Sequence, residues 1–237
     1  MARKPTFADH VINFNSNLNF TGPLPPGIRI MNPFRERPQI KDVMSSFYQK
    51  FYNDHDVRQM IIGINPGRLG SGSTGVPFSD TKRMREVHGI EIEGMKTHEP
   101  SAVFIHDVIS AYGGPEAFYK RFYIGSVVPL GFTSIQPGGK EINYNYYDSK
   151  ALTDAVYDFI VSSLKEQLTF GIDTSVVYCL GTGKNVTFLE KLNSKERFFG
   201  KIVPLEHPRF VMQYKSKTKD LYVDKYLKAF EDNKKAL

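Results

Sequence analysis

The sequence predicts an α/β protein, a three-layer α/β/α sandwich with a mostly parallel central four-stranded sheet. Two features of the chain predict this fold class. Four short apolar runs, each typical of a buried strand, alternate with segments of helical periodicity. The chain also has 237 residues with 41% hydrophobic composition, enough for one large core, and no linker-like break divides it. We therefore expect a single domain over residues 1–237, with residues 1–30 as a peripheral helix and loop.

The first third of the chain predicts two helices and one strand. Apolar side chains recur at helical spacing over residues 7–18, and the proline-rich stretch 23–27 ends that helix. Residues 40–52 indicate a second helix, and the apolar run 60–64 is typical of a buried strand. We expect residues 65–75 to form a loop, because glycine at such density destabilises regular elements.

The rest of the chain alternates helices with three further strands. Helices are expected over residues 81–88, 101–112, 148–168 and 217–235, and another is expected to begin near residue 184. Strands are expected over residues 122–130, 175–180 and 201–205. Asp148 is the expected N-cap of the long helix. Ligands of such folds bind beyond the carboxyl ends of the strands, which directs attention to the loops after Ile64, Val128 and Leu205.

Composition and charge narrow the class of protein. The formal net charge of +6 favours a polyanionic partner, nucleic acid first, although it also fits a generically basic soluble protein. The single cysteine, Cys179, permits no internal disulfide and indicates a reducing compartment, so we expect a cytoplasmic protein. The chain has no run of 18 apolar residues and no apolar segment near its start, so we expect neither a membrane span nor a signal peptide. We expect a monomer.

Two of the candidate loops contain side chains suited to chemistry. Asn65 follows the first strand in a glycine-rich loop, where a ligand can approach the backbone closely. His207 follows the fourth strand, beside Arg209. Taken alone, the first loop also fits a plain turn, because Asn-Pro and Pro-Gly are common turn pairs. Taken alone, the second loop also fits a surface histidine next to a proline. The spacing of His98, His106 and Asp107 fits no metal motif, and we expect no metal site.

Taken together, the loops resemble a known family. The sequences Gly-Ile-Asn-Pro-Gly at 63–67, Thr-Gly-Val-Pro-Phe at 74–78 and His-Pro at 207–208 resemble motifs of the uracil-DNA glycosylase superfamily. The strand at 122–130, with Pro-Leu at its end, is similar to the middle strand of the single-strand-selective monofunctional (SMUG-type) branch. The resemblance covers most of the chain. It implies a uracil-DNA-glycosylase-like fold and hydrolysis of the N-glycosidic bond of a damaged base in DNA.

The resemblance also implies roles for three side chains. Asn65 matches the asparagine that positions the attacking water, and Phe78 matches the aromatic residue that stacks on the flipped base. His207 matches the histidine that stabilises negative charge on the departing base. These roles suit the chemistry, because a base must leave the stack before attack and leaves as an anion.

The resemblance places the base-binding residues Ile64, Gly67 and Ser126 around the same base. Gly67 stands where strict uracil enzymes have a tyrosine that excludes a 5-methyl group, so glycine leaves room for 5-substituted pyrimidines. Ser126 stands where the SMUG-type branch has an asparagine. A hydroxyl offers one rotatable hydrogen in place of an amide's fixed donor and acceptor, so xanthine or hypoxanthine become candidate substrates. Asn143 and Asn145 either contribute to base reading or only form turns.

Contacts to the DNA backbone are expected from two segments. Arg209 replaces the serine of the family's His-Pro-Ser pattern and offers a charge to a phosphate. Phe210, Val211 and Met212 are candidates for an apolar wedge between bases, or for ordinary packing. Lys184 follows a Gly-Thr-Gly turn that departs from the nucleotide-binding phosphate-loop pattern, so an ATPase is not expected, but its amides and ammonium suit a DNA phosphate.

The sequence therefore predicts a monofunctional DNA glycosylase of base excision repair, acting on uracil or other deaminated or modified bases in single- or double-stranded DNA. No cofactor is expected, and without a catalytic lysine no strand cleavage is expected. One alternative is a non-catalytic nucleic-acid-binding module on the same fold. The pair Asn65 and His207 argues against it, because binding alone needs neither. The other alternative is a nucleoside or nucleotide hydrolase, which turnover of a free nucleoside would favour.

Overall fold

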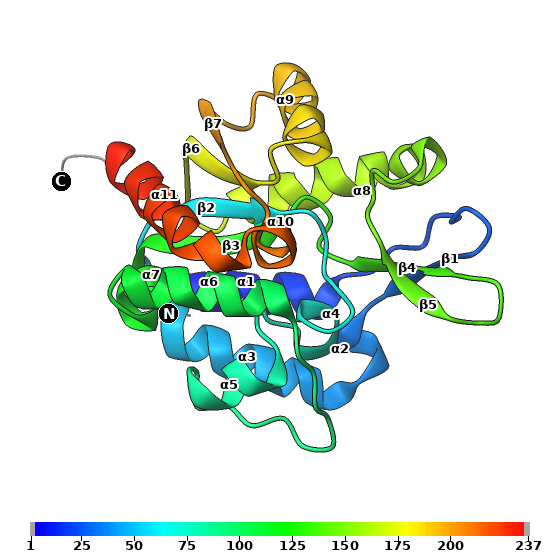
Figure 1. Cartoon of the computed structure of the whole chain (residues 1–237), viewed down its shortest axis with the longest axis horizontal. Coiled ribbons are helices and arrows are strands. Elements are labelled where there is room, and N and C mark those ends of the chain that lie inside the picture. Colours follow the sequence, from blue (N-terminus) through cyan, green and yellow to red (C-terminus); the bar gives the residue numbers. More distant parts are fainter. Residues whose placement is uncertain (1–2, 235–237) are drawn as a thin grey trace.

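A parallel four-stranded sheet forms the centre of the computed structural model, which describes residues 3–234 (Figure 1). Its strands are β2 (Arg58–Gly63), β3 (Phe122–Ser126), β6 (Ile172–Leu180) and β7 (Lys201–Leu205). They lie in the order β3–β2–β6–β7, and every neighbouring pair is parallel. The predicted four strands and the parallel sheet are confirmed.

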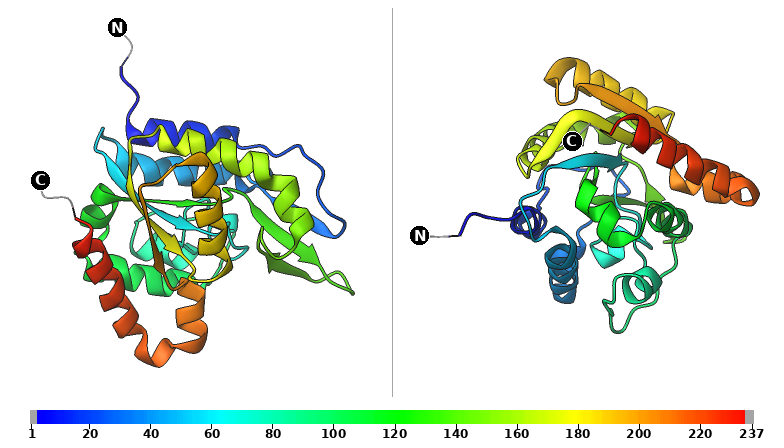
Figure 2. Two further views of the ribbon diagram at one scale, coloured as in Figure 1. Left: turned by 90° about the horizontal axis from the view of Figure 1, so that it is seen from above. Right: turned by 90° about the vertical axis from the view of Figure 1, so that its left-hand side faces the viewer.

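Helices cover both faces of this sheet (Figure 2). Adjacent residues of a strand point to opposite faces, and two aromatic neighbours on β3 show what covers each. The Phe122 ring lies 4.5 Å from that of Phe230 on α11 (Lys219–Asp232), measured between centroids. The Tyr123 ring lies 5.4 Å from that of Phe7 on α1 (Phe7–Asn17). The chain thus forms the expected three layers, and α1 belongs to the core and not to the periphery.

The predicted helices are present with shifted ends. They are α1, α3 (Pro38–Tyr52), α5 (Thr81–Glu86), α6 (Pro100–Ala111), α8 (Lys150–Leu168), α9 (Lys184–Glu196) and α11. The N-cap of α8 is Ser149 and not Asp148, because the Ser149 hydroxyl accepts from the Leu152 N–H at 3.1 Å. Asp148 instead accepts from the backbone of Asn145. The last helix begins at Lys219, after a 3₁₀ turn (Ser216–Thr218), and the expected end at residue 235 lies outside the described residues, as do residues 1–2.

A second sheet was not predicted. It is antiparallel, in the order β1 (Ile28–Met31), β4 (Gly131–Ile135) and β5 (Glu141–Tyr144), and it projects beside the main sheet (Figure 1). The strand expected over 122–130 therefore ends at Ser126, and the chain turns there before β4 begins. Helices α2 (Pro33–Glu36) and α7 (Pro115–Arg121) were also not predicted.

Two expected loops contain short helices. The segment 65–75 includes one helical turn, α4 (Ser71–Thr74), closed by Gly75 at φ 72°. The segment after His207 forms α10 (Pro208–Tyr214), whose first helical residue is a proline. Within residues 3–234, no helix has both the length and the apolar character needed to cross a membrane.

Candidate active site

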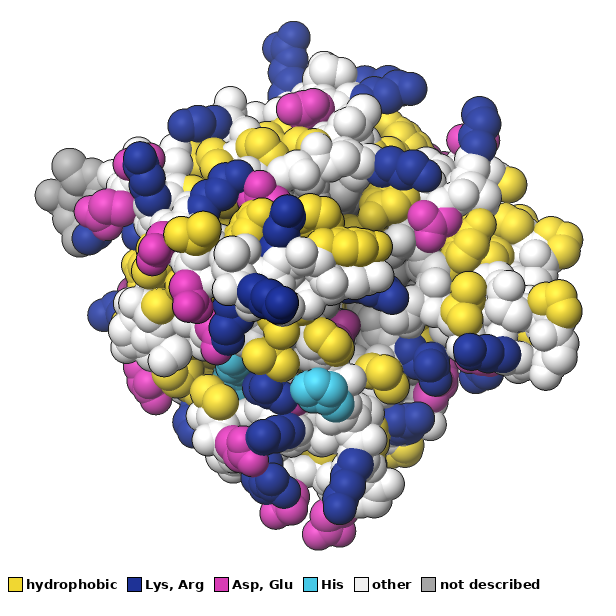
Figure 3. All heavy atoms as spheres, viewed as in Figure 1, with side chains coloured by type: hydrophobic (Ala, Val, Ile, Leu, Met, Phe, Trp, Pro, Cys, Tyr) yellow, Lys and Arg dark blue, Asp and Glu magenta, His cyan; other side chains and the backbone are white. Residues whose placement is uncertain are grey.

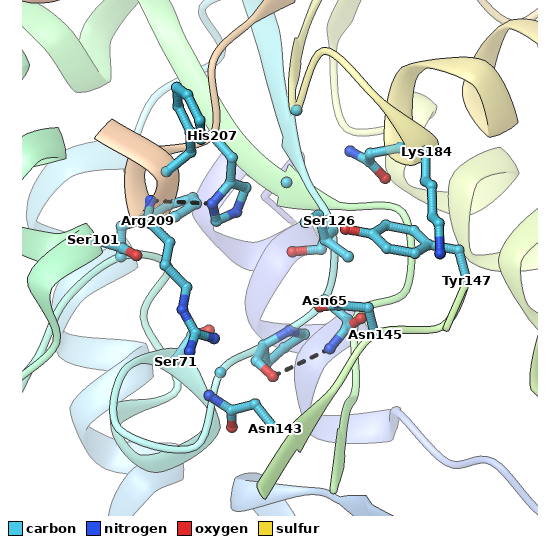
Figure 4. A pocket seen from close by; sticks show the side chains of 18 of the residues that line it. Asn65, Ser71, Ser101, Ser126, Asn143, Asn145, Tyr147, Lys184, His207 and Arg209 are labelled. Atoms are coloured by element: carbon cyan, nitrogen blue, oxygen red, sulfur yellow. Dashed lines mark hydrogen bonds between the residues drawn. The ribbon is translucent and has the colours of Figure 1, made fainter. Parts of the chain in front are cut away.

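A pocket of about 600 Å³ opens at the carboxyl ends of the four parallel strands. Each strand contributes residues at its carboxyl end or just after it. Gly63 to Gly67 extend from β2, Ser126 ends β3, Gly181 to Asn185 follow β6, and His207 follows β7. Figure 4 shows these side chains converging from separate segments of the chain. The pocket thus lies beyond the strand ends, where the sequence directs attention, and ligand binding there stays a prediction.

Asn65 is held by backbone groups of the loop after β5. Its Oδ1 accepts from the N–H of Tyr146 at 3.1 Å, and its Nδ2 donates to the carbonyl of Tyr144 at 3.2 Å and more weakly to that of Pro66 at 3.4 Å. These bonds fix which end of the amide points where. Because a carbonyl oxygen has two lone pairs, Oδ1 can still accept from a water molecule in the pocket. Asn65 is therefore oriented to hold water and not to remove a proton.

Phe78 lines the same pocket as Asn65 and lies beside His207. The two rings are 6.0 Å apart between centroids, with planes inclined at 54°. The Phe78 ring packs over Gly63, where a Cβ would lie at an ordinary contact distance of 3.5 Å from it. Phe78 has φ 48°, a left-handed conformation that costs a non-glycine residue about 1–3 kcal/mol. The neighbouring Ser79 is fixed by its carbonyl, which accepts from the Thr74 hydroxyl at 2.7 Å.

A buried histidine pair completes the support of this loop. The Ser79 hydroxyl lies 3.3 Å from Nε2 of His88 and 3.3 Å from Nε2 of His106. Burial lowers the pKa of His88 to about 3 and that of His106 to about 4, so both rings are neutral near pH 7. The strained backbone of Phe78 is thus held by packed neighbours on its carboxyl side.

His207 is the N-cap of α10, and this position determines its chemistry. Its Nδ1 accepts from the Arg209 N–H at 3.1 Å. Burial, with a smaller contribution from the Arg209 charge, lowers the pKa of His207 to about 4. The ring is therefore neutral at pH 7, and because Nδ1 is an acceptor, the proton must be on Nε2. His207 presents an N–H donor without a positive charge.

The other predicted base-binding residues line the same pocket. Ser126 pairs with Gly63 in the β2–β3 ladder, and the carbonyl of Ile64 accepts from Val128 at 3.1 Å. The space beside Gly67 is not empty, however. A Cβ on Gly67 would lie 3.0 Å from Oε1 of Glu99 and 3.7 Å from Nδ2 of Asn143. The predicted room for a 5-substituent is thus bounded by polar groups.

The predicted DNA-facing residues of α10 divide by helix face. Arg209 and Phe210 line the pocket, and Phe210 is 41% exposed. Val211 is completely buried, so its side chain offers no surface to DNA, and Met212 packs against the core. Tyr214, which was not predicted, is 65% exposed, and its ring lies 5.5 Å from that of Phe210. The helix thus presents an aromatic pair outward.

Lys184 begins α9 and lines the opposite side of the pocket. Its ammonium lies 5.9 Å from the ring centroid of Tyr147, a further residue that was not predicted. Lys and Arg side chains are spread widely over the face seen in Figure 3, with Asp and Glu among them. Positive and negative side chains are therefore interspersed on this face.

Sequence reasoning missed Glu99 altogether. It precedes α6, 32 residues after Gly67 in no motif, and it reaches the pocket only through the fold. Burial, and next the Asp80 carboxylate, raise the pKa of Glu99 to about 7, while Arg209 opposes the shift. A carboxyl group that changes its charge near neutral pH therefore faces the candidate site.

Residues 3–234 contain no group of three or more His, Cys, Asp or Glu arranged to hold a metal ion. The three residues considered from the sequence have other partners. His98 lies 3.5 Å from Asp80, His106 lies beside Ser79, and Asp107 pairs with Lys219.

Comparisons with known proteins agree with this geometry. The sequence model described as the uracil DNA glycosylase superfamily matches residues 49–231. Eleven chains of solved structures match, among them the wild-type SMUG2 of Pedobacter heparinus. The match has a TM-score of 0.94 and 58% sequence identity, and it covers 96% of this chain and 97% of that chain. The comparison with curated proteins found no match.

Proposed function

This chain belongs to the uracil DNA glycosylase superfamily and is a hydrolase of the DNA glycosylase type, and we propose that Asn65 and His207 are its chemical pair. Its reaction is hydrolysis of the N-glycosidic bond of uracil or a related modified base in DNA. We also propose that it acts as a monomer in the cytoplasm, on a base turned out of the DNA stack. No step needs a metal or a cofactor.

One observation carries the proposed roles. Asn65, Phe78 and His207 come from distant parts of the sequence and line one pocket at one edge of the sheet (Figure 4). A water-holding amide, a stacking ring and a neutral N–H donor are the three groups that base excision needs. A module that only binds nucleic acid needs neither the amide nor the donor at this depth.

The reaction follows from the charges that develop. As the bond between sugar and base lengthens, positive charge builds on the sugar and negative charge on the base. His207 donates from Nε2 to the base oxygen, where the negative charge gathers. Its fixed position means that no reorganisation is needed during the reaction. Asn65 holds the water that then attacks the sugar carbon. Because Asn65 is a poor base, stabilisation of the departing base lowers the barrier most, and the expelled base anion or solvent takes the proton that the attacking water loses.

Base flipping requires groups that replace the lost stacking. Phe78 supplies about 1–3 kcal/mol of stacking to the flipped base. We propose that the rings of Phe210 and Tyr214, which are exposed and lie side by side, fill the gap left in the strand. Arg209 and Lys184, on opposite sides of the pocket, provide charges for the phosphates next to the flipped nucleotide.

The test uses oligonucleotides, single- and double-stranded, that contain uracil, 5-hydroxymethyluracil, xanthine or hypoxanthine. Abasic sites are scored after single-turnover incubation. We expect excision of at least uracil, and Asn65→Ala should lower the rate about 10²-fold or more. Asn19→Ala, an exposed asparagine outside the pocket, is the matched control and should leave the rate unchanged. Turnover of free deoxyuridine without action on DNA would support a nucleoside hydrolase instead.

A further inference from the structure

Glu99 is the acidic side chain among the described residues that line the pocket. It is the residue before α6, and its own N–H donates to Oδ2 of Asp80 at 3.0 Å. This bond fixes the backbone of Glu99 against the start of α5 and leaves the side chain directed at the loop after Asn65. The reaction as derived above gives this carboxyl group no part.

Two glycines create the space that the Glu99 carboxyl group occupies. A Cβ on Gly70 would lie 1.6 Å from Oε2 of Glu99, a distance that two non-bonded atoms cannot adopt. A Cβ on Gly67 would lie 3.0 Å from Oε1 of Glu99. The carboxyl group therefore rests directly on the backbone of the loop that holds Asn65. Larger residues at these two positions would have to displace it.

Asn143 on β5 faces the same point from the other side. Its Oδ1 accepts from the N–H of Arg68 at 2.9 Å, which turns its Nδ2 toward the pocket. That Nδ2 lies 3.7 Å from the place where a Cβ on Gly67 would be. Figure 4 shows the Arg209 side chain extending from α10 toward Ser71 and Asn143. The wall beside Gly67 therefore combines a carboxyl group, an amide donor and a guanidinium.

The Glu99 carboxyl group has charged neighbours but no hydrogen-bond donor among the described residues. Asp80 is fully buried and is already engaged by the Arg83 N–H at 2.9 Å and the Arg83 guanidinium at 3.2 Å. His98 also faces Asp80, at 3.5 Å. Arg209 is the cation whose charge acts on Glu99 itself. Because Glu99 is half-buried and lines the open pocket, water can hydrate its carboxyl group, and a bound base that displaces this water must replace its hydrogen bonds.

On this geometry, and given the proposed function, we propose that Glu99 is a specificity-determining residue whose carboxyl group contacts the flipped base from the side of Gly67. When protonated it donates to a base oxygen, and when ionised it accepts from an N–H or O–H of the base. A base that offers the matching group beside Gly67 is favoured. A base that offers only a methyl group there must desolvate the carboxyl group without compensation, and it is rejected.

The test compares excision of uracil, 5-hydroxymethyluracil, xanthine and hypoxanthine by the wild type, Glu99→Gln and Glu99→Ala at pH 6, 7 and 8. The measured quantity is the ratio of each single-turnover rate to that for uracil. Removing one base contact should change at least one ratio about tenfold. In the wild type that ratio should vary over this pH range, because the pKa of Glu99 is about 7, whereas in Glu99→Gln it should be constant.

Glu93→Gln is the matched control, since Glu93 is exposed and lies outside the pocket. Circular dichroism and thermal unfolding verify that each variant is folded, and Glu99→Ala serves if Glu99→Gln does not fold. Ratios that stay within threefold of the wild type at every pH would overturn the proposal. A wild type without excision of any base would overturn the proposed function instead, so the two failures are distinguishable.

Discussion

Replacing His207 by asparagine separates its two functions in this structure. The imidazole caps α10 through Nδ1, which accepts from Arg209 at 3.1 Å, and it points Nε2–H into the pocket. Asparagine is a good N-cap residue, so His207→Asn keeps the cap, but its shorter side chain cannot place a donor where Nε2 lies. Loss of one preorganised donor to a developing anion lowers the rate about 10²–10³-fold, or about 2.7–4 kcal/mol.

His207→Ala removes both functions and serves as the comparison. It should lose the same factor in rate and, in addition, about 0.5–2 kcal/mol of stability from the lost cap. The assay is single-turnover release of uracil from an oligonucleotide, paired with urea unfolding of each variant. We expect equal rates for the two variants and lower stability for His207→Ala alone.

The same reasoning predicts the pH profile. Because the pKa of His207 is about 4, the ring is neutral throughout the range from pH 6 to 8, and its ionisation should produce no inflection in the rate near pH 6.5. A wild-type rate that stays level below pH 6.5 and falls about tenfold per pH unit above it, with this slope lost in His207→Asn, would instead show an imidazolium catalyst. Near-normal excision by His207→Asn would equally refute the proposed role.

Three further outcomes are expected. Phe78→Ala should lower kcat/KM for uracil about 5–150-fold through lost stacking of about 1–3 kcal/mol, while Phe78→Tyr keeps most of the rate; equal rates for both would contradict a stacking role. Lys184→Ala should reduce the slope of log Kd against log salt by about 1, whereas Lys191→Ala, exposed on the same helix, should not. Stability should fall as the pH decreases from about 6.5 toward 4. Burial lowers the pKa values of His88 and His106 in the folded state, so over this range these two side chains bind protons only in the unfolded state. Urea midpoints that stay constant over this range would contradict the pKa values.

The parallel sheet could be predicted because its strands are apolar on both faces. Such strands appear as continuous apolar runs, as in Met60 to Ile62, and their order alternates with helices. The starts of β3 and β7 were predicted, but those of β2 and β6 were not. β2 begins at Arg58, which is fully buried because Asp54 pairs with its guanidinium at 2.8 Å. A charged residue is assigned to the surface unless its partner is known.

Within the site, residues in local motifs were predictable and residues brought in by tertiary contacts were not. Asn65, Phe78 and His207 each stand next to a proline, and Asn65 and His207 also follow strand ends, where the sequence marks a loop. Glu99 also stands next to a proline, Pro100, but it follows no strand and belongs to no motif of the family. The roles of the residues after His207 depended on whether that segment is a helix. In α10 helical spacing places Phe210 and Tyr214 on one face and turns Val211 inward.

The unpredicted antiparallel sheet has a direct part in the chemistry. Its strands are only four or five residues long, so even the alternation of polar and apolar residues over Glu141–Tyr144 is too short to give a strong signal. Yet β5 ends at Tyr144, whose carbonyl accepts from Asn65, and two residues later the Tyr146 N–H donates to Asn65 Oδ1. The Tyr146 hydroxyl then donates to Asn185 at 2.8 Å, at the start of α9. This one segment therefore bonds both to Asn65 and to the first turn of α9, where Lys184 lies. In this way the small sheet fixes the direction of the Asn65 amide relative to the side of the pocket that we propose to face the phosphates.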